Sequence, residues 1–130
     1  MSSVEASPDS PAKPLNIAIV GGGKEVADFL RLAETLVFGG YRFNVVGIAN
    51  PNPDAESVQL AREQGLGIIT TDYREFFKLP DLHIIVELTG DEAVRADIER
   101  SKPPHIRLTD ALGASLFWEL YRAQQAIIRQ

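Results

Sequence analysis

The chain alternates short apolar runs with longer segments in which apolar residues recur every three or four positions. The short runs are rich in branched side chains and predict strands buried on both faces, whereas the longer segments predict amphipathic helices. Because the connections are short, the alternation favours a parallel sheet covered by helices on both faces and joined by right-handed crossovers. We expect the strands over residues 15–20, 43–49, 67–70, 82–88 and 105–109.

Four helices are expected between these strands. The first begins at Lys24 and continues to Val37, where two glycines stop it. Asn52 is a candidate cap for the second, which runs to about Gln64, with Pro53 in its first turn. The third is a short helix that follows Asp72 and Glu75, which have the spacing of a capping box, and ends before Pro80; the fourth runs from Asp91 to Arg100.

These elements predict an α/β fold of the doubly wound, Rossmann-like type. It has a parallel sheet of about five strands in the order 3-2-1-4-5, so that strand one is central and strands three and five lie at the edges. Edge strands of such a sheet are short or half polar, and the third and fifth runs have this character. A long C-terminal helix follows, over residues 110–130.

The length of 130 residues is typical of one domain. Residues 1–14 contain three prolines and four serines, which predicts a flexible tail and leaves a domain over residues 15–130. The tail lacks the basic start and apolar middle of a signal peptide, and no later stretch has the ~20 apolar residues that span a bilayer.

The composition indicates which partners to expect. With 13 basic against 18 acidic side chains and a net charge of −5, the chain repels nucleic-acid phosphates and anionic lipid, so neither partner is expected. The chain has no cysteine, which fits the cytoplasm and excludes thiolate metal sites and thiol nucleophiles. We expect no metal and no catalytic residue; His83 and His105 are expected at strand entrances, away from any ligand.

Three consecutive glycines, Gly21, Gly22 and Gly23, stand between the first strand and the first helix. This arrangement presents backbone N–H groups and a helix N-terminus to an anion such as a diphosphate, and Lys24 can neutralise a phosphate. Gly21 and Gly23 match the first two positions of the dinucleotide fingerprint G-x-G-x-x-G. Val26 occupies the third, which predicts a helix set slightly off the sheet. The alternative is that the glycines only turn the chain.

Other candidate residues follow the second and fourth strands. Asn50 stands where an acidic residue usually binds the adenosine ribose, or else is a turn residue before Pro51. Thr89 and Gly90 adjoin the glycine loop and can line a nicotinamide-side pocket, or only form the next turn. Glu87 is a carboxylate in an apolar strand, so we expect it to point into the crevice or to pair with a basic neighbour.

The segments IAIVGGG (17–23), VVGIANPNPDA (45–55), TTDYREFFKLPDL (70–82) and IIVELTG (84–90) together resemble a known domain. They resemble the Rossmann domain that opens oxidoreductases of the glucose-fructose and homoserine dehydrogenase type. A closer resemblance extends through KPP (102–104) to LFWEL (116–120). It is to the small NAD-binding-like domain at the N-terminus of some bacterial sensor histidine kinases and PAS-containing signalling proteins.

The resemblance implies a regulatory module for a dinucleotide, NAD or NADP. It places Gly21 to Gly23 at the phosphates, Asn50 where such domains commonly show Asp, and Thr89 and Gly90 near the ring. The first interpretation is therefore a non-catalytic NAD(P)-binding sensor module of bacterial signal transduction. The alternatives are the cofactor domain of an NAD(P)-dependent oxidoreductase that acts with a separate substrate-binding chain, and a ligand-free scaffold for protein interaction.

The C-terminal segment favours an interaction. A helix over residues 110–130 would be ~30 Å long, more than the ~17–20 Å of the strands, so it should extend past the sheet. Its apolar side chains spread beyond one stripe. We therefore expect a homodimer through the helical extension, residues 118–130, and a kinase or PAS protein as a further partner.

Overall fold

The computed structural model describes residues 13–21, 23–33, 37–38 and 40–110, together with 119 and 123. The expected tail falls largely on residues 1–12, outside the described residues, and so does most of the expected C-terminal helix; Glu119 and Ala123 are helical and exposed. The elements are β1 (Lys13–Val20), α1 (Lys24–Ala33), β2 (Val37–Phe38), β3 (Tyr41–Ala49), α2 (Glu56–Glu63), β4 (Ile68–Thr70), the 3-10 helix η1 (Tyr73–Lys78), β5 (Ile84–Glu87), α3 (Glu92–Ser101) and β6 (Arg107–Thr109).

Five of the six strands in the sheet are parallel, in the order β4-β3-β1-β5-β6. Counted along the chain, this is the predicted order 3-2-1-4-5, and the doubly wound Rossmann-like fold is confirmed. The edge strands β4 and β6 have three residues each, as expected of edges. Strand β1 begins at Lys13, two residues before the expected start, because Lys13 and Pro14 pair with the first residues of β3.

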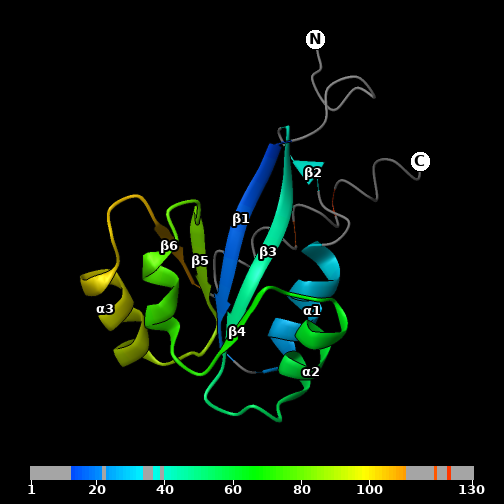
Figure 1. Cartoon of the computed structure of the whole chain (residues 1–130), viewed down its shortest axis with the longest axis horizontal. Coiled ribbons are helices and arrows are strands. Elements are labelled where there is room, and N and C mark those ends of the chain that lie inside the picture. The colour runs from blue at the N-terminus through cyan, green and yellow to red at the C-terminus, as the bar shows by residue number, and fades with distance from the viewer. Residues whose placement is uncertain are drawn as a thin grey trace.

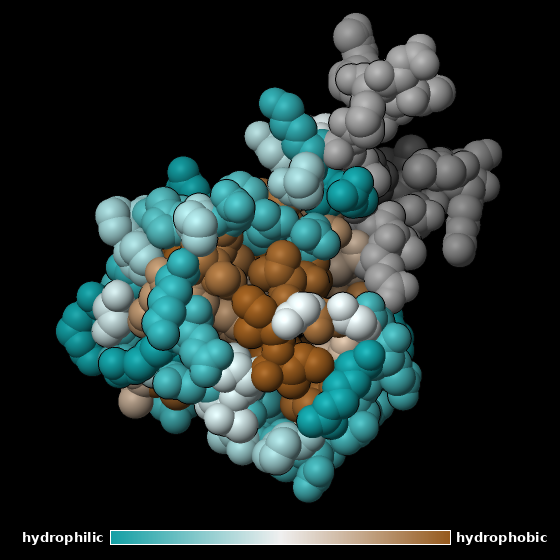
Figure 2. Space-filling view, in the orientation of Figure 1, coloured by the Kyte–Doolittle hydropathy of each residue, from teal (hydrophilic) through white to brown (hydrophobic). Residues whose placement is uncertain are grey.

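Helices cover both faces of the sheet, with α1 and α2 on one side and η1 and α3 on the other (Figure 1). The first face buries one apolar cluster and the second face another. Apolar surface also gathers between the helical layers, over β3 and β4 (Figure 2), where β4 pairs only with the last three residues of β3. No helix of the described residues is long and apolar enough to cross a membrane.

The end of the first helix differs from the prediction. Helix α1 ends at Ala33, and Val37 and Phe38 form β2, which runs antiparallel to the start of β3. Val37 has the spacing of a helical apolar position, but it is β-branched and lies two residues before a Gly-Gly pair. Gly40 has a φ of +85°, the left-handed conformation that a tight hairpin turn requires.

Of the two predicted caps, Asn52 does not cap its helix and Asp72 does. Helix α2 begins at Glu56, four residues after Asn52, whose Oδ1 instead accepts the Asp54 N–H at 3.0 Å in a turn. Asp72 does cap η1, because its Oδ1 accepts the Arg74 N–H at 3.0 Å. The reciprocal half of a capping box is replaced, since the Asp72 N–H donates to Thr70 Oγ1 at 3.0 Å.

Asp97 on α3 ties that helix to η1. It accepts hydrogen bonds from the Tyr73 hydroxyl and from Arg74 at 2.7 Å, and Arg100 pairs with its other oxygen at 3.0 Å. The Tyr73 hydroxyl, helped by the Arg74 guanidinium, holds the pKa of Asp97 below its usual value, against the opposing effect of desolvation. The same contact raises the pKa of Tyr73.

This cluster predicts a pH-dependent stability. Because the pKa of Asp97 is lower in the folded than in the unfolded chain, its stabilisation is complete above about pH 4 and is lost as the pH falls through the folded value. Thermal melts between pH 7 and pH 2.5 should therefore show a shallower acid decline for Asp97→Asn than for the wild type. Glu99→Gln, which removes an exposed carboxylate of the same helix, is the control. Parallel acid limbs for Asp97→Asn and the wild type would contradict the assignment.

Candidate functional site

The carboxyl ends of β1, β3 and β5 meet at one edge of the sheet, at the point where the strand order reverses. Val20, the last residue of β1, pairs with Ala49 on one side and with Glu87 on the other. Two backbone bonds continue the contact beyond the strands, from Gly21 N–H to the Ala49 carbonyl at 3.0 Å and from Leu88 N–H to the Val20 carbonyl at 2.7 Å. The loops after the three strands are therefore neighbours.

Gly21 is buried at the centre of this edge and has a φ of +144°. A Cβ there would lie 3.0 Å from the Leu88 carbonyl carbon and 3.2 Å from the Thr89 nitrogen. The chain's own packing thus requires this glycine, which matches the tight-turn role of the first glycine of a dinucleotide loop. Leu88, whose backbone lies closest to the position of a Gly21 Cβ, was not among the sequence-based candidates. Its apolar side chain indicates only the end of a strand.

Gly23 lies on the open side of the loop. A Cβ on Gly23 would meet, among the described residues, only the carboxylate of Glu25, at 2.5 Å from Oε1. No acceptor from the described residues reaches the N–H groups of Gly23 and Lys24, where α1 begins. Gly23 and Lys24 are both exposed, and Gly22 lies outside the described residues. This backbone fits the close approach of an anionic group such as a diphosphate.

Val26, at the third fingerprint position, is fully buried in the core beneath α1. It packs with Ile19 of β1 and Leu88 in one cluster. A valine here serves helix–strand packing, the same task that a glycine performs by close approach.

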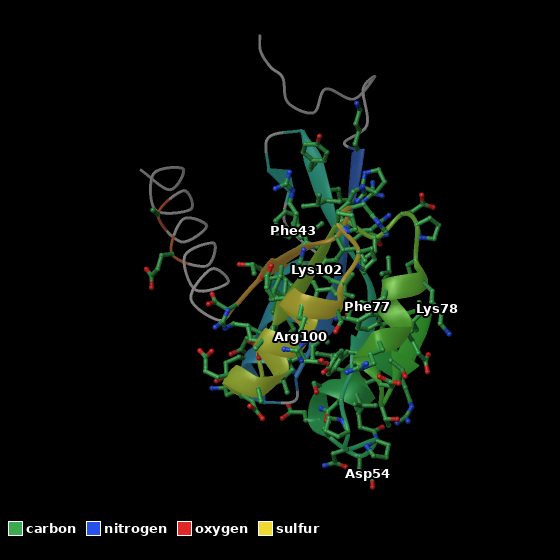
Figure 3. All side chains as sticks on the ribbon, turned by 90° about the vertical axis from the view of Figure 1, so that its left-hand side faces the viewer. Phe43, Asp54, Phe77, Lys78, Arg100 and Lys102 are labelled. Atoms are coloured by element: carbon green, nitrogen blue, oxygen red, sulfur yellow. The ribbon has the colours of Figure 1, made fainter. Side chains whose placement is uncertain are left out.

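Asn50 is 4 % exposed, and both ends of its amide are engaged. Its Oδ1 accepts the Asn52 N–H at 2.9 Å, and its Nδ2 lies 3.4 Å from the hydroxyl of Ser57, which is buried on α2. In this structure the side chain therefore holds the turn that leads into α2, and contact with a ribose stays a prediction. Sequence reasoning did not single out Ser57, since only the fold brings it under Asn50. Asp54 lies further out, near the tip of the same loop (Figure 3).

Glu87 is 3 % exposed, and the donors that bind its carboxylate belong to Thr89 and not to a basic side chain. Its Oε2 accepts the Thr89 N–H at 2.6 Å and the Thr89 hydroxyl, so the turn after β5 satisfies the carboxylate. Thr89 Oγ1 also accepts the Asp91 N–H at 2.9 Å. Gly90 is exposed with a φ of +73°, and a Cβ on it would meet no atom of the described residues within 4 Å, so they leave the end of this turn open.

Both histidines lie at the opposite edge of the sheet. His83 precedes β5, where its Nδ1 accepts the Asn16 N–H at 2.8 Å. His105 precedes β6 and contacts the Leu79 carbonyl at 3.1 Å. The expectation that they stand at strand entrances, away from the glycine loop, is confirmed. Within the described part of the chain, no three His, Asp or Glu side chains gather where they could hold a metal ion.

The structure thus brings together Gly21, Thr89 and the start of the Asn50 loop at the switch point of a doubly wound sheet. Gly23 and Lys24 follow Gly21 in the same loop, and Gly90 follows Thr89. In such sheets this crevice is where ligands bind. The loop combines a buried glycine that closes the turn with an exposed glycine at a helix N-terminus. The arrangement can bind an anionic ligand by backbone N–H groups.

Comparison with known proteins agrees with this fold. No family model matches the sequence, and no curated protein matches it. Among solved structures, levoglucosan dehydrogenase in complex with NADH and levoglucosan is similar over 74 % of this chain, with 25 % identity and a TM-score of 0.52. Homoserine dehydrogenase from S. aureus is similar over 76 %, with 20 % identity and a TM-score of 0.50. The chain spans about a quarter of their lengths, 27 % and 26 %.

Proposed function

We propose that this domain binds a dinucleotide, NAD or NADP, across the carboxyl edge of its sheet. The observation that carries the proposal is the pair of glycines at the switch point, one buried where a side chain would strike Leu88 and one exposed where backbone can approach a ligand. The similarity to a dehydrogenase solved with NADH supports it. When bound, the dinucleotide supplies a ring that accepts or donates a hydride, and the protein supplies the binding site.

Each predicted site residue has a role in this proposal. Gly21, Gly22, Gly23 and Lys24 hold the diphosphate at the N-terminus of α1. Asn50 lies on the adenosine side, where its amide orders the loop toward the ribose. Thr89 and Gly90 lie on the nicotinamide side, where the exposed glycine leaves room for a ring.

We propose further that the domain is a non-catalytic regulatory module. Its histidines lie at the far edge of the sheet, and the side chains of Glu87, Thr89 and Asn50 are occupied by hydrogen bonds within the protein. Proton transfer to a substrate would require one of these groups to be released. A signalling context with a kinase or PAS protein as partner belongs to the same proposal and is supported by the sequence resemblance. A cytoplasmic location, which the lack of cysteine fits, and a homodimer through residues 118–130, which the apolar pattern of that segment supports, are proposed with it.

The dehydrogenase neighbours favour one alternative, that the domain is the cofactor-binding part of an oxidoreductase whose substrate site is supplied from elsewhere. Oxidation of NADH or NADPH, followed at 340 nm after addition of a candidate substrate-binding chain and a carbonyl substrate that accepts the hydride, distinguishes the two. Turnover favours the alternative, and binding without turnover favours the regulatory module.

The binding proposal is tested by thermal melting with NAD⁺, NADH, NADP⁺ and NADPH. A ligand present at a hundred times its dissociation constant adds about 2.7 kcal/mol to the free energy of unfolding, which raises Tm by several degrees in a domain of this size. ATP at the same concentration controls for general nucleotide effects. If Tm stayed the same with all four dinucleotides, the domain would be a scaffold without this ligand.

A further inference from the structure

Glu87 places a negative charge inside an otherwise apolar part of the sheet. Its strand neighbours Val86 and Leu88 are buried and apolar, and so is its partner Val20 on β1. Burying a carboxylate is costly even when hydrogen bonds compensate it, as the two bonds from Thr89 do here. The charge therefore calls for an explanation other than packing.

The carboxylate lies directly beside the glycine loop. The Thr89 nitrogen that donates to Glu87 Oε2 at 2.6 Å is the atom that would lie 3.2 Å from a Cβ on Gly21. One hydrogen bond thus separates the carboxylate from the centre of the candidate site. The two bonds from Thr89 to the same oxygen hold it in place.

The position of Glu87 along the edge determines which half of a dinucleotide it meets. With the diphosphate at the glycine loop and the adenosine toward Asn50 after β3, the nicotinamide half extends to the other side of β1. That side is formed by β5 and β6, and Glu87 is the last residue of β5.

Other charges on this side do not cancel that of Glu87. Arg95 on α3 has its pKa raised mainly by Glu92, and also by Asp110 and Glu87. It is already bonded to Glu92 at 2.6 Å, and its side chain is 38 % exposed, so water screens it. Asp91, which caps α3, adds a further carboxylate. Acidic groups therefore outnumber basic ones around the turn after β5.

We propose that Glu87 makes this domain prefer the oxidised dinucleotide over the reduced one, so that it reports the redox state of the NAD(P) pool. The inference rests on the proposed dinucleotide binding. The nicotinamide ring carries a positive charge in NAD(P)⁺ and none in NAD(P)H, and a fixed, poorly hydrated carboxylate stabilises only the charged ring. At the separations and effective dielectric of a partly buried site, one such charge changes the affinity ratio by about tenfold.

The test compares dissociation constants for the oxidised and reduced forms by isothermal titration calorimetry, with the wild type, Glu87→Gln and Glu63→Gln. Glutamine keeps the shape of Glu87 and an oxygen for the Thr89 donors, and Glu63 is an exposed acid at the far end of α2. We expect the wild type to bind NAD⁺ more tightly than NADH and Glu87→Gln to lose about tenfold of that preference. Glu63→Gln should retain it. ADP-ribose, which lacks the ring, should bind Glu87→Gln and wild type equally.

Each other outcome is informative. An unchanged ratio in Glu87→Gln, with ADP-ribose still bound, overturns the role of Glu87 and leaves the binding proposal standing. If Glu87→Gln does not fold, the wild type alone decides, because NADH binding as tight as NAD⁺ overturns the preference. If the wild type binds neither form nor ADP-ribose, the proposed function fails and this inference fails with it.

Discussion

Replacing Phe76 by alanine is expected to lower the free energy of unfolding by about 3–5 kcal/mol. Phe76 is fully buried, and its ring lies in the cluster beneath η1 and α3. It also fills the space that Gly47 leaves open on β3, where a Cβ would lie 3.0 Å from Phe76 Cε1. Because η1 lies on the connection from β4 to β5, this one side chain anchors the crossover at which the strand order reverses.

Urea denaturation followed by circular dichroism measures the effect. The midpoint should fall with little change in the m-value, since the native surface is largely retained. Phe77→Ala is the matched control, because Phe77 is the next residue of η1 and only half-buried (Figure 3). Its loss should be clearly smaller. Equal losses for the two variants would show that the crossover is not anchored through Phe76.

Much of the sheet was predictable from local pattern. The runs that became β1, β3 and β5 are apolar and branched because both faces of each strand are covered, and this signal does not depend on distant residues. Strand β2 was not predictable in this way. Its two residues continue the apolar spacing of α1, and what makes them a strand is pairing with Tyr41 and Arg42.

The candidate site was predictable in its location and less so in its hydrogen bonds. Glycines after the first strand indicate the switch point, and this signal does not depend on which hydrogen bonds the neighbouring side chains form. The partners of Asn50 depend on where α2 packs, because Ser57 reaches the amide only in the folded chain. Glu87 is a different case: its partner Thr89 is two residues away, so a carboxylate followed by a hydroxyl at i+2 in a turn was a readable local signal.

Replacement by alanine should destabilise the protein strongly at one of the two described loop glycines and hardly at all at the other. Gly21→Ala forces a side chain into a φ of +144° and against the Leu88 backbone at 3.0 Å. Backbone strain and overpacking together predict a loss of about 2–5 kcal/mol in unfolding free energy. Gly23 is not in a left-handed conformation, and its Cβ would displace only the flexible carboxylate of Glu25. Gly23→Ala should therefore change stability by no more than about 0.5 kcal/mol.

The alanine that leaves stability unchanged, at Gly23, is the one expected to weaken NAD⁺ binding. At Gly23 the added methyl stands on the open side of the loop, where the backbone must approach the diphosphate, so NAD⁺ affinity should fall at least about tenfold in a protein that melts normally. Melting curves and NAD⁺ titrations of the same preparations measure both quantities. Full NAD⁺ affinity in Gly23→Ala would place the ligand elsewhere, and wild-type stability in Gly21→Ala would mean that the loop can move away from Leu88. Lost affinity with intact stability at Gly23 requires a ligand at the loop, because a glycine that only turned the chain would affect folding first.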